Sequence, residues 1–200
     1  MKTEASPTQP ITRRDFLKAS TVAASAAAIG TLDLSRSAHA AGSDIIKVGM
    51  IGCGGRNTGA AAQALSADPG ARLVAMCDIF RDRIDGAREE LKKEKGAQVT
   101  VADDHCFTGF DGYKHVIEAS DVVLIANAAK FHPFHAMSAI RAGRHVFVEK
   151  PHGIDPLGVK LMQQACDLAQ KKELCIVSGL QSRFHTGYIE TVKRIHDGAI

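Results

Sequence analysis

The sequence contains no tryptophan, and aromatic residues make up only 5% of its 200 residues. It also has little net charge, because 25 Lys and Arg stand against 22 Asp and Glu. Proteins that bind nucleic acid without sequence preference need a strong basic field and aromatic platforms for the bases, so we expect no nucleic-acid partner. Hydrophobic residues, at 45%, are numerous enough for a globular core.

The sequence also lacks any Cys-x-x-Cys pair and any dense group of metal ligands. His105 stands beside Cys106, and His132 lies three residues before His135, but neither pair has a third ligand nearby. Zinc sites in proteins need three or four such ligands, so we predict no metal site. The strand and helix contexts of the five cysteines favour buried free thiols over disulfides. They are Cys53, Cys77, Cys106, Cys166 and Cys175.

A long apolar run is absent as well. The uncharged stretch over residues 19–32 is short and rich in Ala, Ser and Thr, whereas a membrane-spanning helix needs about 20 strongly apolar residues. Before it, residues 12–18 read Thr-Arg-Arg-Asp-Phe-Leu-Lys, which is typical of a twin-arginine export signal. After it, residues 37–40 read Ser-Ala-His-Ala, a cleavage site of the small-x-small type. We therefore predict a signal peptide over residues 1–40, use of the twin-arginine translocation machinery, a periplasmic location and no stable membrane anchor.

After the signal, β-branched runs alternate with amphipathic or Ala-rich stretches, the pattern of βαβ units. The runs are nearly continuous in their apolar residues, as in a parallel sheet with helices on both faces. We predict an α/β fold of the Rossmann type, a doubly wound parallel sheet, over residues 41–180. The predicted strands are 45–51, 73–77, 99–102, 122–126, 145–148 and 174–178, and the predicted helices are 60–66, 81–95, 133–142 and 156–172.

The first predicted strand leads directly into a glycine-rich turn. A dinucleotide site needs one glycine for the tight turn, a second for close approach of the pyrophosphate, and a small third residue for helix packing. Gly52 and Gly54 take the first two places, whereas Asn57 stands at the third. Gly55 and Arg56 lie where the N-terminus of the next helix would meet the pyrophosphate. We predict that these five residues bind the cofactor.

Asp78 ends the second predicted strand, 26 residues after Gly52. An acidic side chain there can accept hydrogen bonds from the adenosine ribose, and its charge repels a 2′-phosphate. The prediction is therefore NAD, with NADP left open because Arg81 and Arg83 follow. Alternatively, Asp78 caps the helix that begins after it.

Residues 142–151 read Ala-Gly-Arg-His-Val-Phe-Val-Glu-Lys-Pro, and here the chain resembles the Gfo/Idh/MocA oxidoreductases, the family of glucose-fructose oxidoreductase and inositol dehydrogenase. The resemblance runs from about residue 47 to the last residue. It implies that Lys150 is catalytic, orienting a substrate hydroxyl and assisting proton transfer, and that Glu149 belongs to the same signature. It places Asn127, His132 and Glu149 among the cofactor-binding residues, although the family often has Thr-Pro where this chain has Asn-Ala. By composition alone, Lys150 would be a surface lysine beside a turn proline.

The resemblance also has implications for the segment after the sixth strand. Residues 181–200 would begin a truncated C-terminal α/β substrate domain, in which Arg183 approaches the nicotinamide or pairs with a carboxylate at the domain boundary. Tyr188, Val192 and Ile195 mark one face of a helix, which we expect to be buried in the core. We expect further catalytic residues beyond residue 200, and a homo-oligomer when the protein is full length.

The activity that the resemblance implies is hydride transfer between a sugar or cyclitol hydroxyl and a tightly held NAD(P). Two alternatives stay open: an NAD-dependent glycoside hydrolase of the same fold, and a non-catalytic nucleotide-binding sensor. We expect residues 1–200 to be inactive by themselves.

Overall fold

The structure, a computed structural model, describes residues 44–199. The predicted signal peptide over residues 1–40 therefore lies outside the described residues. The fold below is that of the compact unit that begins at Ile45. Each helix between residues 44 and 199 is too short or too polar to span a bilayer.

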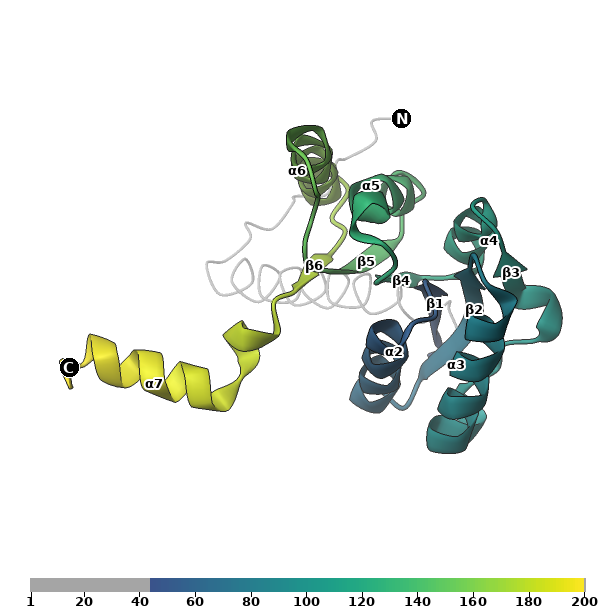
Figure 1. The fold of residues 1–200 in the computed structure, drawn as a ribbon, viewed down its shortest axis with the longest axis horizontal. Coiled ribbons are helices and arrows are strands. Elements are labelled where there is room, and N and C mark those ends of the chain that lie inside the picture. Colours follow the sequence, from purple (N-terminus) through teal and green to yellow (C-terminus); the bar gives the residue numbers. More distant parts are fainter. Residues whose placement is uncertain (1–43, 200) are drawn as a thin grey trace, which may run out of the picture. The chain divides into compact units, whose positions relative to one another are not determined.

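Six parallel strands form one sheet in the order β3-β2-β1-β4-β5-β6 (Figure 1). This order confirms the predicted Rossmann-type fold. The chain winds outward from β1 in one direction and then from β4 in the other, and ligands of such sheets bind where the order reverses. The strands are β1 (Ile46–Ile51), β2 (Ala71–Asp78), β3 (Cys106–Thr108), β4 (Val122–Ile125), β5 (His145–Glu149) and β6 (Ile176–Gly179).

Helices cover both faces of the sheet, and each face has its own apolar core. Met50 packs with α2 (Gly55–Ala67) and α3 (Arg81–Lys95) on one face. The next residue, Ile51, belongs to the core on the opposite face, because successive strand residues point to opposite sides of the sheet. Three further helices contribute to that core. Both faces therefore need apolar side chains, which explains the continuous apolar runs. The three helices are α4 (Gly112–Ala119), α5 (His132–Arg141) and α6 (Pro156–Lys171).

The prediction of the third strand is wrong. Residues 99–102 form only one isolated bridge, between Val99 and Leu73, and the strand that pairs with β2 is Cys106–Thr108. Val99 and Val101 are nevertheless buried, so their apolar character reflects packing and not a ladder. Helix α4 was not predicted, although Tyr113, Val116 and Ile117 give it a buried face with helical spacing.

Helix α2 begins at Gly55, five residues before the predicted start at Ala60. The alanine run indicates the interior of this helix but not its first turn, which contains polar and glycine residues. As a result, Arg56 and Asn57 lie in the first helical turn and not in the preceding loop.

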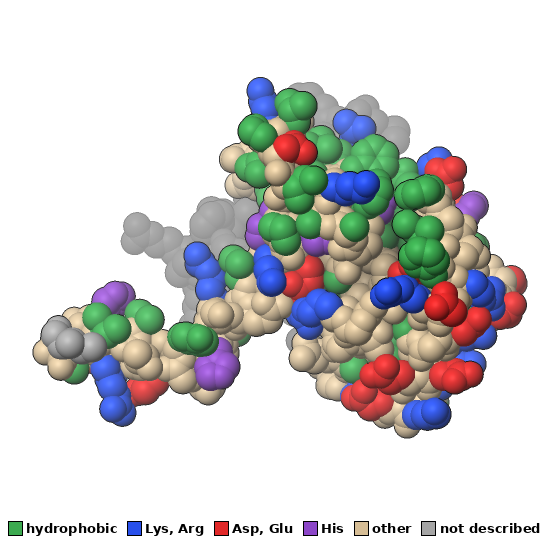
Figure 2. All heavy atoms as spheres, viewed as in Figure 1, with side chains coloured by type: hydrophobic (Ala, Val, Ile, Leu, Met, Phe, Trp, Pro, Cys, Tyr) green, Lys and Arg blue, Asp and Glu red, His purple; other side chains and the backbone are tan. Residues whose placement is uncertain are grey.

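The segment after β6 forms a short 3₁₀ helix, η4 (Gln181–Phe184), followed by α7 (Thr186–His196). The prediction that Tyr188, Val192 and Ile195 are core residues is wrong within the described part of the chain, where they are 58%, 48% and 44% exposed. Apolar side chains are accordingly visible on the surface of α7 (Figure 2). An amphipathic pattern shows which face of a helix is apolar, but it does not show what covers that face.

The five cysteines are free, as predicted, but only three are buried. Cys53, Cys77 and Cys106 lie in the core, whereas Cys166 and Cys175 are exposed, contrary to the prediction. Burial raises the pKa of Cys77 to about 12, and burial also raises the pKa of Cys53 strongly. Both side chains therefore remain neutral thiols at physiological pH.

Candidate functional site

The turn between β1 and α2 requires glycine at its first position. Gly52 has a φ of 89°, and its N–H donates to the Cys77 carbonyl at 2.8 Å. A Cβ atom at position 52 would lie 2.8 Å from Cα and 2.7 Å from Cβ of Asn127. The turn after β1 and the end of β4 thus approach each other more closely than any side chain would allow.

The N-terminus of α2 is open to an anion. Gly54, its N-cap, offers no side chain, and the first turn contains no acidic residue. The N–H groups of Asn57 and Thr58 donate back to the Gly54 carbonyl, at 3.0 and 3.1 Å. The earlier N–H groups of Gly55 and Arg56 have no backbone acceptor among residues 44–199. Free N–H groups and the positive end of the helix dipole fit a pyrophosphate at this turn.

Asn57 supports the turn from beneath and does not face a ligand, so the predicted cofactor contact of its side chain needs correction. Its side chain is fully buried, and Nδ2 donates to the carbonyls of Ile51, Gly52 and Leu124 at 3.1, 2.7 and 3.2 Å. These bonds fix the end of β1 against β4. A third glycine could not make them, which gives a physical reason for the departure from the glycine pattern.

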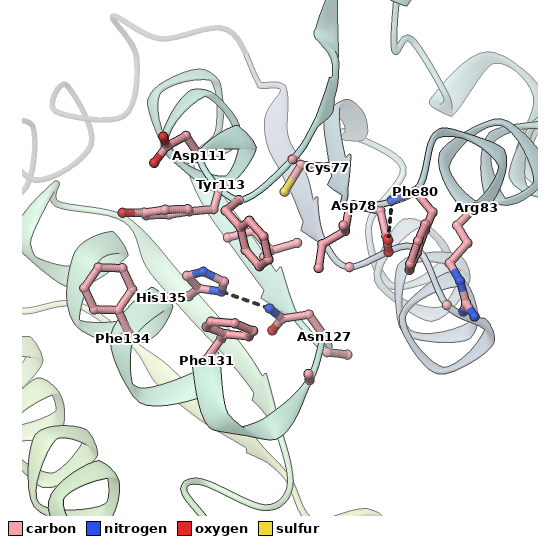
Figure 3. Close-up of a pocket in the computed structure, with 18 of the residues that line it drawn as sticks. Cys77, Asp78, Phe80, Arg83, Asp111, Tyr113, Asn127, Phe131, Phe134 and His135 are labelled. Carbon is pink, nitrogen blue, oxygen red and sulfur yellow. Dashed lines mark hydrogen bonds between the residues drawn. The ribbon is translucent and has the colours of Figure 1, made fainter.

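A cavity of about 750 Å³ opens beside the glycine turn, at the carboxyl ends of β1, β2 and β4. Gly52, Gly54 and Asp78 line it together with a set of aromatic side chains (Figure 3). The Asp78 carboxylate accepts the Cys53 N–H at 2.7 Å and the Phe80 N–H at 3.1 Å. Each carboxylate oxygen can accept a second bond, so Asp78 both fixes the turn and remains able to bind ribose hydroxyls. The alternative prediction, that Asp78 caps the following helix, is wrong, because the N-cap of α3 is Phe80 and no side chain of the described residues caps this helix.

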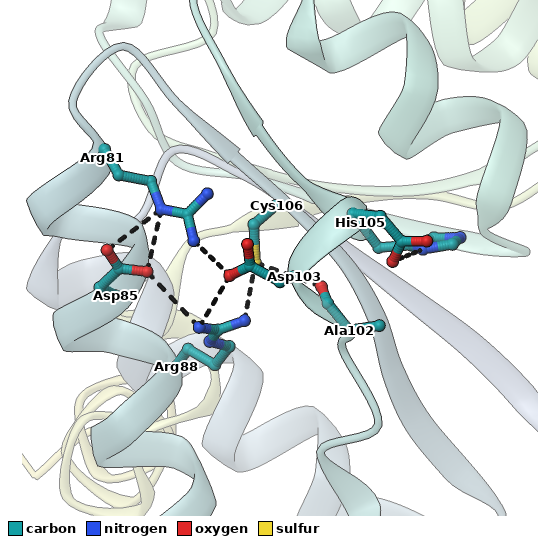
Figure 4. A network of polar contacts seen from close by, with 8 residues as sticks. Arg81, Asp85, Arg88, Ala102, Asp103, His105 and Cys106 are labelled. Atoms are coloured by element: carbon teal, nitrogen blue, oxygen red, sulfur yellow. Dashed lines mark hydrogen bonds and ion pairs between the residues drawn. The ribbon is translucent and has the colours of Figure 1, made fainter.

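The two arginines that follow Asp78 differ in position. Arg81 pairs with Asp85 and Asp103 in a network that also includes Arg88 (Figure 4). Arg83 has no ion pair among the described residues; it lines the cavity with its guanidinium 6.0 Å from the Phe80 ring. Only Arg83 is therefore placed to meet a phosphate group in the cavity.

Asn127, at the end of β4, lines this cavity and also a second one. Its Nδ2 lies 3.2 Å from Nδ1 of His135, which is stacked between Tyr113 and Phe131 with ring centroids 4.5 and 5.7 Å away. Burial, followed by the nearby His132, lowers the pKa of His135 to about 4, so the ring is neutral and can accept this bond. Oδ1 of Asn127 is buried and has no partner among the described residues. It is an acceptor available to a donor such as a hydroxyl or amide of a cofactor.

The second cavity, of about 710 Å³, surrounds Lys150 at the end of β5. The Lys150 side chain is exposed and has no ion pair within residues 44–199. The peptide bond to Pro151 is cis. Because Ala126 and Asn127 line both cavities, the predicted catalytic lysine and the glycine turn share one continuous strand edge.

Glu149 also lines this cavity, but its carboxylate is only 3% exposed. Oε1 accepts Nε of Arg56 at 2.7 Å and Nε2 of Gln181 at 2.6 Å, while Oε2 accepts the Lys150 N–H at 3.2 Å. Burial opposes ionisation, yet the hydrogen bonds from Arg56 and Gln181 hold the pKa of Glu149 below its usual value. The carboxylate is therefore charged and fully engaged by the protein, which corrects the prediction that Glu149 and Arg56 serve mainly as direct cofactor contacts.

His132, which was predicted to contact the cofactor, lines the lysine cavity, but both of its ring nitrogens bridge within the protein. It is 2% exposed, with Nδ1 2.8 Å from the Pro151 carbonyl and Nε2 3.0 Å from the Asn127 carbonyl. It thereby connects the loops after β4 and β5.

The structure does not place Arg183 in the position that the sequence suggested. Arg183 is exposed in η4 and lines neither cavity, and it makes no ion pair within the described residues. Gln181 lines the lysine cavity and bonds Glu149. The aromatic wall formed by Phe131 and His135 was not predicted; the closely spaced aromatic and histidine residues over 131–135 were its only signal in the sequence.

Over residues 44–199, no group of three or more His, Cys, Asp or Glu side chains is arranged to hold a metal ion.

Comparison with protein families gives two matches. Residues 46–179 match the family GFO_IDH_MocA, described as "Oxidoreductase family, NAD-binding Rossmann fold". Residues 10–30 match the twin-arginine translocation pathway signal sequence, which confirms the predicted export signal.

Individual proteins are similar over part of their length. "Glycosyl hydrolase family 109 protein 1" of Bacteroides fragilis is 33% identical over 111 residues, which cover 54% of this chain and 23% of that protein. The chain thus spans about a quarter of the length of this curated relative. A crystal structure of apo scyllo-inositol dehydrogenase from Lactobacillus casei superposes with a TM-score of 0.60 at 27% identity, covering 78% of this chain and 43% of that one.

A third similarity concerns the fold alone. A 3-ketoreductase from Actinomadura kijaniata, in complex with NADP and TDP-benzene, superposes with a TM-score of 0.59 at 23% identity. The alignment covers 78% of this chain and 43% of the ketoreductase.

Proposed function

The chain belongs to the GFO_IDH_MocA oxidoreductase family, and from this premise we propose that it transfers hydride between NAD(P) and a sugar or cyclitol hydroxyl. The observation that carries the proposal is the position of Lys150. This lysine directly follows β5, forms no ion pair within residues 44–199, and lines a cavity that shares Asn127 with the glycine-turn cavity. A group that moves a proton thus lies beside the place where a dinucleotide fits.

The residues of the larger cavity fit a nicotinamide dinucleotide. The free N–H groups at the start of α2 would hold the pyrophosphate, and Gly52 permits its close approach. Asp78 would accept the ribose hydroxyls, and the unpartnered Oδ1 of Asn127 would accept a bond from the nicotinamide half. When bound, the cofactor accepts or donates the hydride.

Lys150 would act on the substrate oxygen. In the oxidation, the C–H bond of the alcohol breaks with its electron pair leaving as hydride, and the hydroxyl proton passes to the neutral Nζ of Lys150 as the carbonyl forms. In the reverse direction the Lys150 ammonium returns this proton to the carbonyl oxygen. The surrounding residues do not exchange protons in this scheme; they hold the lysine in place.

We further propose that the mature protein works in the periplasm and carries its cofactor with it. The matched twin-arginine signal supports export, and this pathway moves folded proteins. We also propose that residues 181–200, with η4 and α7, begin a substrate domain.

We predict that the protein binds NAD⁺ more tightly than NADP⁺, and that Arg83 determines how large the difference is. The Asp78 carboxylate repels a 2′-phosphate, whereas the Arg83 guanidinium attracts it. Arg83→Ala should therefore weaken NADP⁺ binding by about tenfold, the effect of losing one charge-assisted hydrogen bond, and change NAD⁺ binding little. Calorimetric titration with both dinucleotides measures the two dissociation constants.

Arg81→Ala is the matched control. It removes the same charge from the same turn of α3, but Arg81 is held by Asp85 and Asp103 and does not line the cavity. Equal losses of NADP⁺ affinity in both variants would show that the effect comes from the overall positive charge near the cavity, and would refute the specific role of Arg83.

A second candidate function is cleavage of glycosidic bonds, which the similarity to the Bacteroides fragilis glycosyl hydrolase family 109 protein favours. In that chemistry a ring hydroxyl is first oxidised, the carbonyl acidifies the neighbouring C–H, the glycosidic oxygen leaves by elimination, and addition of water and reduction complete the hydrolysis. No net reduction of the cofactor results. Lys150 would serve the oxidation and reduction steps in the same way.

Incubating the complete protein with free sugars, cyclitols and aryl glycosides distinguishes these functions. Formation of NADH in equal amount with a ketone supports the oxidoreductase. Release of the aryl alcohol without net NADH shows the glycosidase instead. Cofactor binding without turnover of any of these substrates would point to the sensor.

A further inference from the structure

The residues on either side of Lys150 are fastened to the rest of the fold, while its own side chain is free. On one side stands the engaged carboxylate of Glu149. On the other side the Pro151 carbonyl bonds His132 at 2.8 Å, and Nε2 of His152 lies 2.6 Å from the Ser178 hydroxyl. Such anchoring is the arrangement expected where a reacting group must be held in one geometry.

Among these anchors, the Glu149 carboxylate connects the most distant parts of the chain. It binds Arg56 in the first turn of α2, Gln181 in η4, and the Lys150 N–H. Room for it depends on Gly179, because a Cβ at that position would lie 2.6 Å from the carboxylate carbon. One buried group thus joins the phosphate end of the site, the catalytic strand and the segment after β6.

We propose that Glu149 is a positioning residue for Lys150, and that Arg56 keeps Glu149 in the charged form which this role requires. The inference rests on the proposed function, since it assumes that Lys150 moves the proton. Arg56 lies where it could have contacted the pyrophosphate, but its guanidinium is turned to Glu149 through two nitrogens. The phosphate is left to the backbone N–H groups, so cofactor binding and the Glu149 contact do not compete for one side chain.

A protonated Glu149 would hold these contacts less strongly. A neutral carboxyl is a weaker acceptor than a carboxylate, and its protonation removes the ion pair with Arg56. The charged and titratable groups near Glu149 are Arg56 from α2, Lys150 directly after β5 and His132 from α5, all of which line the same cavity, while Gln181 from η4 is neutral. Of these, only Arg56 forms an ion pair with the carboxylate.

Arg56→Gln in the complete protein tests the inference through the pH profile of kcat. In the wild type the pKa of Glu149 is lowered, so the carboxylate stays charged as the pH falls. Without Arg56 the pKa of Glu149 rises. At pH values between the wild-type and the variant pKa, Glu149 is protonated in the variant but charged in the wild type. In that interval kcat should fall by about 10²-fold, the cost of displacing a catalytic group by about 1 Å, and recover at higher pH. A purely structural loss would lower kcat equally at all pH values.

Three further variants sharpen the test. Arg56→Lys restores the positive charge and should return the acidic limb of the profile toward that of the wild type. A glutamine at position 149 cannot titrate. The double variant with Glu149→Gln and Arg56→Gln should therefore have a lowered kcat at every pH and should not show the additional fall in kcat at acidic pH. His132 is unchanged in all of these proteins.

The outcomes separate this inference from the proposed function. If Lys150→Ala abolishes turnover but the profiles of Arg56→Gln and the wild type coincide, Glu149 is not a positioning residue of this kind. If Arg56→Gln does not fold, the single variant Glu149→Gln must lower kcat at every pH, and a wild-type kcat in it overturns the inference. If Lys150→Ala leaves turnover unchanged, the proposed function fails first. Equilibrium unfolding against pH, without cofactor, should independently show Arg56→Gln less stable than the wild type at neutral pH, with the difference narrowing on acidification, because the wild type alone loses the stability that a lowered native pKa of Glu149 provides.

Discussion

Lys150→Ala is expected to lower kcat for hydride transfer by about 10²- to 10⁴-fold, the contribution of a positioned proton-transfer group. Cofactor affinity should change little, because Lys150 does not line the larger cavity beside the glycine turn. Single-turnover measurement of NADH formation, combined with titration of the cofactor, reports the two quantities separately.

Lys160→Ala provides the control, since this exposed lysine lies on α6 and lines neither cavity of the site. It should behave as the wild type in both measurements. Turnover that survives in Lys150→Ala would remove the lysine from the mechanism. A large loss of cofactor affinity with unchanged kcat would reassign it to binding.

Gly52→Ala should destabilise the fold and weaken cofactor binding together. At a φ of 89° a residue with a side chain is strained by about 1–2 kcal/mol, and forcing extra atoms against a packed neighbour costs typically about 1–3 kcal/mol more. The neighbour here is the Asn127 backbone, which follows β4 directly and cannot rotate away. We expect the free energy of unfolding to fall by about 2–5 kcal/mol, measured by denaturant titration.

Gly59→Ala, in the same helix that follows the turn, should have the opposite sign. A Cβ at position 59 meets no atom within 4 Å, and alanine is favoured over glycine inside a helix by up to about 1 kcal/mol. If both alanine variants destabilised the protein equally, the close contact between the turn and β4 would not be the cause.

The parts of this site that could be predicted are those fixed by the backbone. Gly52 follows a buried strand, and Asp78 and Lys150 stand at the ends of other strands of the same sheet, so the fold alone brings them to one edge. The direction in which a polar side chain points is not fixed in this way. Asn57 and His132 each stand where a ligand contact is expected, yet both turn inward to backbone carbonyls, which the sequence does not reveal because their partners are distant in the chain.

The failure at the third strand has a related cause. Val99 and Val101 are as apolar as strand residues, and burial is all that their pattern reports. The position of η2 (Asp103–His105) determines which of the following residues pair with β2. The ion pairs of Arg81 and Arg88 with Asp103 hold η2 against α3. Those contacts join residues at least fifteen positions apart and leave no local signal.

Asn127 makes the two halves of the site dependent on each other. Its amide is oriented by His135 within the aromatic wall, and the same side chain lines the cavity of Lys150. Substitutions at Tyr113 or Phe131, chosen to strengthen cofactor binding in the larger cavity, would therefore also shift an amide that lines the cavity of Lys150. In directed evolution of this protein, cofactor retention and turnover would not vary as separate traits.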